Sequence, residues 1–90
     1  MRGRRPILNE LVRWGQVTHA LWLLARGASP NAADARGWTA LHQAVSRGNE
    51  RMLRALLEAG GDPRGKDAEG VTPFEMAVAK GRKKLVASFR

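Results

Sequence analysis

Apolar residues recur at helical spacing in short stretches along this 90-residue chain, and breaks rich in Gly and Pro separate the stretches. The first stretch contains Ile7, Leu8, Leu11 and Val12, whose spacings of one, three and four place them on one face of a helix. Further apolar stripes lie within residues 17–25, 41–45, 52–57, 76–78 and 85–89. The pattern therefore predicts an all-α chain built from short helices in pairs.

The sequence also repeats itself with a period of 33 residues. Residues 37–42 return as residues 70–75, so that Gly37 and Thr39 are matched by Gly70 and Thr72. The same register aligns three further glycines, Gly15, Gly48 and Gly81. Several anchors in one register indicate a repeat architecture. The period divides a single domain, residues 1–90, into repeats of approximately residues 4–36, 37–69 and 70–90.

The second repeat carries the most recognisable motif. Gly37-Trp38-Thr39-Ala40-Leu41-His42 is followed by Arg47-Gly48 and later by Gly60-Gly61-Asp62-Pro63. This arrangement resembles the ankyrin repeat, which has a unit of about 33 residues and a T-P-L-H-type start. The resemblance covers nearly the whole chain. It implies an ankyrin-repeat solenoid of helix-loop-helix units with projecting hairpin fingers, and usually a protein-binding role, without naming the partner.

Several residues carry signals for the local structure. Thr39 suits a helix N-cap, because its hydroxyl can accept from backbone N–H groups in the first turn. Thr72 begins a capping-box pattern with Glu75, and Gly15, Gly48 and Gly81 permit tight turns between paired helices. His42 stands at the His of the ankyrin start motif, and the resemblance implies that it ties one repeat's turn to the next. No metal or cofactor role is assigned to it.

The last repeat is more polar than the first two. Arg90 stands where the other repeats have Leu24 and Leu57, and residues 82–84 are all cationic. A polar end is what a capping repeat requires, since no neighbour covers it. We therefore expect the two terminal repeats to act as caps. A complete small protein and a fragment of a larger one fit this pattern equally.

The net charge of +8 is concentrated at the two ends of the chain. The eight terminal cations are Arg2, Arg4, Arg5, Lys80, Arg82, Lys83, Lys84 and Arg90, whereas residues 6–79 hold eight basic and eight acidic side chains. A continuous basic face, the usual footprint of a nucleic-acid binder, is therefore not evident. Such tails are usually solvated. Less commonly they bind nucleic acid weakly and without specificity, in a manner that falls steeply with salt.

The composition argues against most chemistry. The chain has no Cys, so disulfides and thiolate sites are excluded. No nucleophile motif, phosphate loop or metal-ligand spacing is present, and we expect no enzyme, no catalytic residue, no metal and no cofactor. The longest apolar run, residues 20–25, falls far short of the ~20 residues that span a bilayer. The expected location is therefore cytoplasmic, with a nuclear location as the alternative.

Two tryptophans mark the candidate binding surface. In ankyrin repeats the residue before the first Thr and the two residues before the inter-helix Gly face the concave surface, and the resemblance places Trp38 and Trp14 there. Their repeat-mates are mainly charged or variable, so exposed indoles are expected, unless each folds down onto its own repeat. Trp22, by contrast, is expected to fill an edge, and His19, which shares its register with Met52 and Leu85, is expected to be at least partly inward. The predicted partner-binding residues are Trp14, Arg36, Trp38, Ser46, Arg47, Glu69, Val71 and Lys80.

Three functions remain open. The first is a protein–protein interaction module that binds an acidic or aromatic-accepting partner segment through its finger tips and concave helix face. The second is nucleic-acid or acidic-polymer binding through the basic termini, which salt dependence would distinguish from the first. The third is a targeting fragment of a larger enzyme. The sequence leaves the oligomeric state open, since an exposed Trp patch could associate with itself.

Overall fold

The computed structural model describes residues 5–89, and this part of the chain contains six helices and no strand. The helices are α1 (Ile7–Arg13), α2 (Val17–Ala25), α3 (Ala40–Arg47), α4 (Glu50–Glu58), α5 (Pro73–Ala79) and α6 (Lys83–Ser88). The predicted all-α class is confirmed, and α2 begins and ends where the apolar pattern placed it. The terminal cations Arg2, Arg4 and Arg90 lie outside the described residues.

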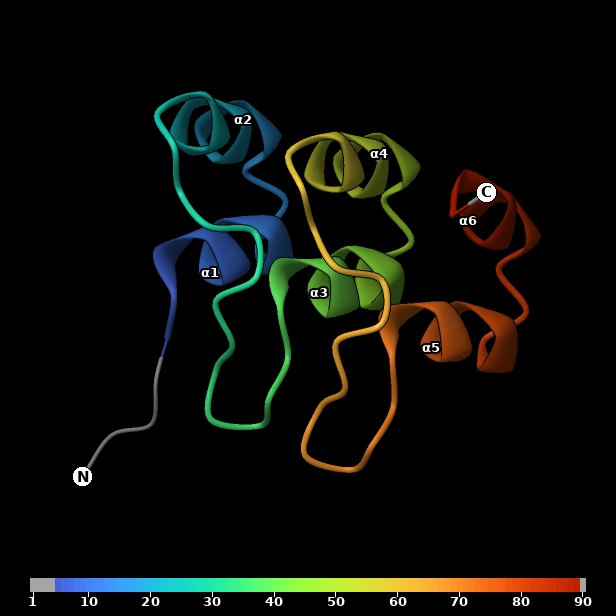
Figure 1. Cartoon of the computed structure of the whole chain (residues 1–90). Coiled ribbons are helices and arrows are strands. Elements are labelled where there is room, and N and C mark those ends of the chain that lie inside the picture. The colour runs from blue at the N-terminus through green and yellow to red at the C-terminus, as the bar shows by residue number, and fades with distance from the viewer. Residues whose placement is uncertain (1–4, 90) are drawn as a thin grey trace.

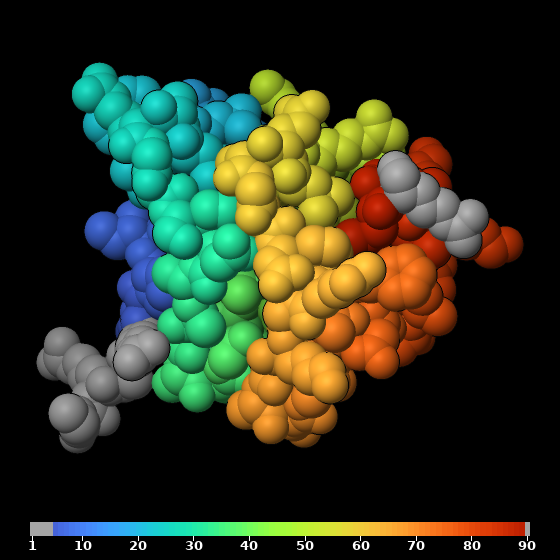
Figure 2. Space-filling view, viewed as in Figure 1, coloured from blue at the N-terminus to red at the C-terminus, as the bar shows by residue number. Residues whose placement is uncertain are grey.

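The helices form two layers (Figure 1). Helices α1, α3 and α5 lie side by side in one layer, and α2, α4 and α6 lie over them in the other. Two long connections, residues 26–39 and 59–72, project from the helices as fingers. Figure 2 shows the two fingers lying against each other, and the Ala68 N–H donates across them to the Arg36 carbonyl at 2.8 Å.

The core is formed where one repeat stacks on the next. Leu8 and Val12 on α1 are buried, as are their counterparts 33 residues later, Leu41 and Val45 on α3. The third pair of counterparts is Phe74, 36% exposed, and Val78, 54% exposed. These positions face the following repeat, and no described element lies beyond α5 to cover them. The third repeat thus combines the predicted polar residues with an apolar outer face.

The first repeat shows the complementary effect at its own outer side. His19, which the register predicts to be at least partly inward, is exposed, whereas its counterparts Met52 and Leu85 are buried. This position faces the preceding repeat. No described helix lies on that side of α2, and the expectation for His19 was therefore wrong.

The inner helices begin with caps that differ between repeats. In the third repeat the Thr72 N–H donates to Glu75 Oε1 and the Glu75 N–H donates to Thr72 Oγ1, both at 3.0 Å. These bonds with Thr72 hold the pKa of Glu75 below its ordinary value. In the second repeat the Thr39 N–H donates to His42 Nδ1 at 3.1 Å. In the first repeat Pro6 occupies the N-cap position and makes no side-chain cap.

A second set of bonds ties each inner helix to the finger beside it. Since His42 Nδ1 accepts from a backbone N–H, the proton lies on Nε2, which donates to the Val71 carbonyl at 2.9 Å. Asn9, the counterpart of His42, donates through Nδ2 to the Trp38 carbonyl at 2.8 Å. Because Trp38 and Val71 are themselves counterparts, the same type of side-chain-to-carbonyl hydrogen bond joins repeat one to repeat two and repeat two to repeat three.

Candidate interaction surface

The first group of predicted residues lies at the turns between paired helices, and we call it the turn row: Trp14, Ser46, Arg47 and Lys80. Trp14, Arg47 and Lys80 each immediately precede a glycine with a positive φ, between 66° and 74°. All three are exposed. Trp14 is 65% exposed, and the Arg13 guanidinium lies 5.1 Å from the centre of its indole ring. The turn row thus presents one exposed aromatic ring, with Arg13 against it, and two exposed cations at the same register of the next two repeats.

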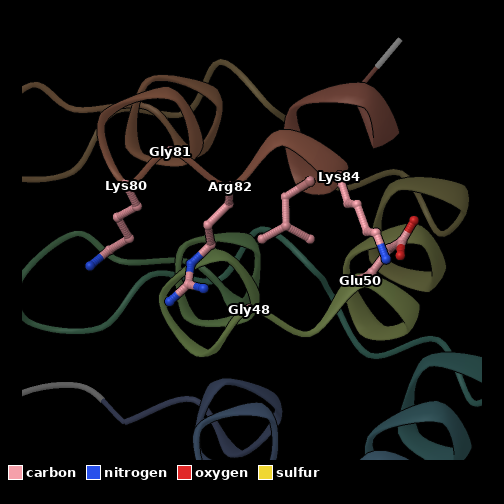
Figure 3. A pocket seen from close by; sticks show the side chains of 7 residues that line it. Gly48, Glu50, Lys80, Gly81, Arg82 and Lys84 are labelled. Carbon is pink, nitrogen blue, oxygen red and sulfur yellow. The ribbon is translucent and has the colours of Figure 1, made fainter.

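Ser46 differs from the rest of the turn row, because an arginine of the next repeat covers it. Arg82 Nη2 donates to the Ser46 carbonyl at 3.1 Å, near the end of α3. Figure 3 shows Arg82 reaching over Gly48 while Lys80 and Lys84 extend to either side. A Cβ at Gly48 would lie 2.8 Å from Arg82 Nη1, so glycine there serves both the φ of 71° and this close approach. The three cations diverge, which gives no convergent site for a single anion.

The second group lies where the fingers meet the inner helices, and we call it the finger group: Arg36, Trp38, Glu69 and Val71. Trp38 is half-buried rather than openly displayed. Its Nε1–H donates to Asp67 Oδ2 at 3.1 Å, and its ring stacks on His42 with centres 5.9 Å apart. The Arg36 guanidinium lies over the indole, 4.1 Å from the centre of the ring. Trp38, near the end of the first finger, is therefore tied to Asp67 of the second finger.

Asp67 organises this contact. Its Oδ1 accepts the N–H groups of Glu69 and Val71, both at 2.9 Å, which fixes the turn of the finger. Burial acts to raise the pKa of Asp67. The two backbone bonds, the nearby His42 imidazole and the Trp38 indole outweigh it and hold the pKa of this carboxyl below its ordinary value of 3.8. The carboxylate stays charged at neutral pH and keeps Trp38 in place.

Asp34 repeats the same turn in the first finger. Its Oδ1 accepts the N–H groups of Arg36 and Trp38 at 2.8 and 2.9 Å. Its other carboxylate oxygen lies 3.7 Å from Arg36 Nη2, an ion pair in which the arginine is largely exposed. Exposed pairs contribute at most about 1 kcal/mol. The aspartate turn, rather than the ion pair, positions Arg36.

The turn row and the finger group do not form one patch. They lie at opposite ends of the inner helices, and the eight residues of α3 separate their levels by ~12 Å at ~1.5 Å per residue. Both have side chains suited to contact and hydrogen bonding. No cluster of three potential metal ligands occurs within residues 5–89. Nor does any helix of that span have the length and apolar character needed to cross a membrane.

Sequence reasoning missed one residue, Asn9, and did not predict the exposure of another, Trp22. Asn9 was not selected, although the 33-residue register aligns it with His42 and could have revealed its role. Trp22, expected to fill an edge, is 56% exposed, with the Arg26 guanidinium 4.5 Å from its ring centre. It lies on α2, in the outer layer and away from both groups. It therefore offers a matched indole for comparison with Trp14.

The sequence was also compared with models of known protein families. A model described as ankyrin repeats, in three copies, matches residues 8–89. The matched span includes every residue of the turn row and the finger group.

Proposed function

This chain belongs to the ankyrin repeat family, whose repeats generally mediate protein–protein interaction, and we propose that it binds a partner protein through the turn row and the finger group. The observation that carries the proposal is the exposed indole of Trp14 against the Arg13 guanidinium, with Arg47 and Lys80 exposed at the same register of the next two repeats. Trp and Arg are the side chains most enriched where binding energy concentrates. An indole left this open in the free protein gains most when a partner covers it.

The structure supports binding with little loss of conformational freedom. The Trp38 indole is held by Asp67 and His42 before any partner arrives, and Asp34 holds the backbone of Arg36, whose guanidinium lies against the Trp38 ring. Groups ordered in advance do not lose rotamer entropy on binding. The finger group would therefore supply shape and direction, while Trp14 in the turn row would supply most of the apolar contact.

The partner segment that suits this surface is acidic. Arg47 and Lys80 are exposed at the register of Trp14 in the next two repeats. The Arg13 guanidinium lies against Trp14, and it is also 3.8 Å from Glu10 as an exposed pair. Such a pair opens at small cost. An acidic segment would gain long-range attraction from the turn row, which speeds encounter more than it deepens affinity.

The test compares two exposed tryptophans. The tagged chain and the variants Trp14→Ala and Trp22→Ala are used to capture proteins from lysate at low and at high salt, after circular dichroism has shown equal folding. We expect one partner that is retained at high salt by the native chain and by Trp22→Ala, and lost with Trp14→Ala. Equal capture by both variants would remove the turn row from the site.

Nucleic acid provides the alternative outcome. Binding through the basic ends would appear as nucleic acid recovered at low salt only, and equally by all three chains, because neutralised phosphates release counterions. That result would transfer the function from the helix face to the terminal cations.

A further inference from the structure

We propose that the turn row binds an acidic partner segment in the polyproline II conformation. An apolar side chain of that segment would pack on Trp14, and carboxylates three and six residues away from it would meet Arg47 and Lys80. This inference rests on the function proposed above, to which it adds the conformation and the residue spacing of the partner.

The turn row has a regular spacing. Trp14, Arg47 and Lys80 are counterparts at intervals of 33 residues, at the ends of α1, α3 and α5, which lie side by side (Figure 1). Helices packed in this way have axes ~8–10 Å apart, so the row advances by about that distance per repeat. Arg47 belongs to the middle repeat, with α1 and α5 packed on either side of α3, and it is exposed. The row is therefore open along the stack, and its exposure does not depend on an end of the chain.

Among the regular backbone conformations, polyproline II matches this spacing best. It has three residues per turn and rises ~3.1 Å per residue, so residues i, i+3 and i+6 lie on one face about 9.3 Å apart. In a β-strand three residues also span ~10 Å, but residues i and i+3 point to opposite faces. The side chains of a strand therefore cannot contact the row at every repeat.

A helical partner suits the row less well. Residues i and i+7 of an α-helix are ~10.5 Å apart, which is close to the spacing of the repeats. Helices that dock on a protein surface, however, present an apolar stripe at positions i, i+3, i+4 and i+7. The turn row offers one large apolar side chain, Trp14, followed by the cations Arg47 and Lys80. A single indole gives no continuous apolar surface for such a stripe.

The surrounding charges determine which end of the segment is acidic. Lys80 in the third repeat lines a pocket of about 470 Å³, which Arg82 and Lys84 also line (Figure 3). Glu50 is the only carboxylate among the described residues that line this pocket. Because the three cations extend in different directions, they suit a run of carboxylates better than a single anion. The acidic end of the segment therefore lies at repeat three, and its apolar end lies on Trp14 at repeat one.

The test uses short peptides preorganised by proline, whose fixed φ and effect on the preceding residue both favour polyproline II. The in-register peptide is capped Leu-Pro-Pro-Glu-Pro-Pro-Glu, and its reversed sequence is also made, because the spacing is the same in both chain directions. The control peptide, Leu-Pro-Glu-Pro-Glu-Pro-Pro, has the same composition and charge but carries its carboxylates off the common face. Each peptide is titrated to about 5 mM into the 15N-labelled chain at low ionic strength, where exposed charge pairs are least screened.

The proteins are the native chain, Trp14→Ala, Arg47→Ala, and Arg51→Ala as a control that removes an exposed cation from α4. We expect saturable shifts of the Trp14 indole and of the Arg47 and Lys80 amides with the in-register peptide in its tighter-binding direction. The control peptide should bind about fivefold more weakly, since it loses two exposed charge pairs. Arg47→Ala should weaken binding of the in-register peptide about threefold and leave the control peptide unchanged, and Arg51→Ala should affect neither. Trp14→Ala should weaken binding of both peptides at least about tenfold.

Equal affinity for the in-register and control peptides would overturn the proposal, as would the absence of shifts at the turn row. Tighter binding of a helical peptide with Leu and two Glu at intervals of seven residues would also overturn it, and would identify a helix as the occupant. The function proposed above fails separately, when capture from lysate does not depend on Trp14. Capture that does depend on Trp14, together with equal peptide affinities, would retain the turn row as the binding surface and reject only the polyproline II segment.

Discussion

Replacing Pro6 with Thr should stabilise the protein, because it restores a bond that the first repeat lacks. Asn9 Oδ1 is buried and has no hydrogen-bond partner. At the equivalent place in the second repeat, His42 Nδ1 accepts the N–H of Thr39. Position 6 is the counterpart of Thr39, and proline has no N–H to donate. Pro6→Thr would supply the missing donor and a capping hydroxyl together.

Three contributions determine how much Pro6→Thr changes the free energy of unfolding. An unsatisfied buried acceptor costs about 1–3 kcal/mol, and a bond to it recovers most of that cost. A threonine N-cap adds about 1 kcal/mol, as Thr72 illustrates by accepting the Glu75 N–H at 3.0 Å. Removing proline frees the unfolded chain and subtracts about 0.4–1 kcal/mol. We expect a net gain of about 1–3 kcal/mol, or a melting temperature higher by at least ~5 °C in a domain of this size.

The assay is urea unfolding followed by circular dichroism, for Pro6→Thr and Pro6→Ala in the native and in the Asn9→Ala backgrounds. Pro6→Ala supplies the N–H alone and should give the smaller gain. The coupling between positions 6 and 9 should be about 1–2 kcal/mol. A Pro6→Thr variant that is less stable than the native chain, or equally improved in both backgrounds, would refute the reasoning about Asn9.

Three further substitutions test the contacts between repeats. Asp67→Asn removes a carboxylate whose pKa is lower in the folded state than in the unfolded state. The native carboxylate stabilises the fold above about pH 4, and this contribution is lost as pH falls through the folded pKa. On acidification from about pH 5, the urea midpoint of the variant should therefore fall less than that of the native chain, and parallel curves would contradict this. His42→Ala leaves the Thr39 N–H without its partner, removes one of the two donors to the Val71 carbonyl, which still accepts the Asp67 N–H, and empties a fully buried position. It should cost about 2–4 kcal/mol in chemical unfolding, whereas a cost below ~1 kcal/mol would deny His42 its linking role. Arg82→Ala removes the hydrogen bond to the Ser46 carbonyl and should lower stability by about 1 kcal/mol in thermal unfolding. The control Lys84→Ala should change stability by less than ~0.5 kcal/mol, and equal effects of the two variants would argue against a stabilising role for this bond.

Much of the fold could be predicted because the relevant information is local and periodic. The apolar spacing placed the helices, and the 33-residue register placed each repeat against the next. The same register explains why Leu41 is buried and Phe74 exposed: equivalent positions differ only in whether another repeat covers them. His19 was misplaced for the same reason, since sequence equivalence does not imply equal neighbours.

The candidate site was less predictable, because it depends on contacts across repeats. Trp14 and Trp38 look alike in the sequence, as large residues on variable rows. Asp67 distinguishes them, since it holds the Trp38 indole from 29 residues further along the chain. Only the stacking of the two fingers reveals that contact. Trp14 has no such acceptor among its described hydrogen bonds and remains exposed.

The most direct measurement is the affinity of the captured partner for three chains, by isothermal titration calorimetry at physiological salt. If the partner binds the turn row, Trp14→Ala should weaken binding relative to the native chain by at least ~2 kcal/mol, about thirtyfold in Kd, while Trp22→Ala should change it by less than ~0.5 kcal/mol. Folded variants that lose less than ~0.5 kcal/mol at Trp14, or that lose as much at Trp22, would contradict the assignment of the binding surface.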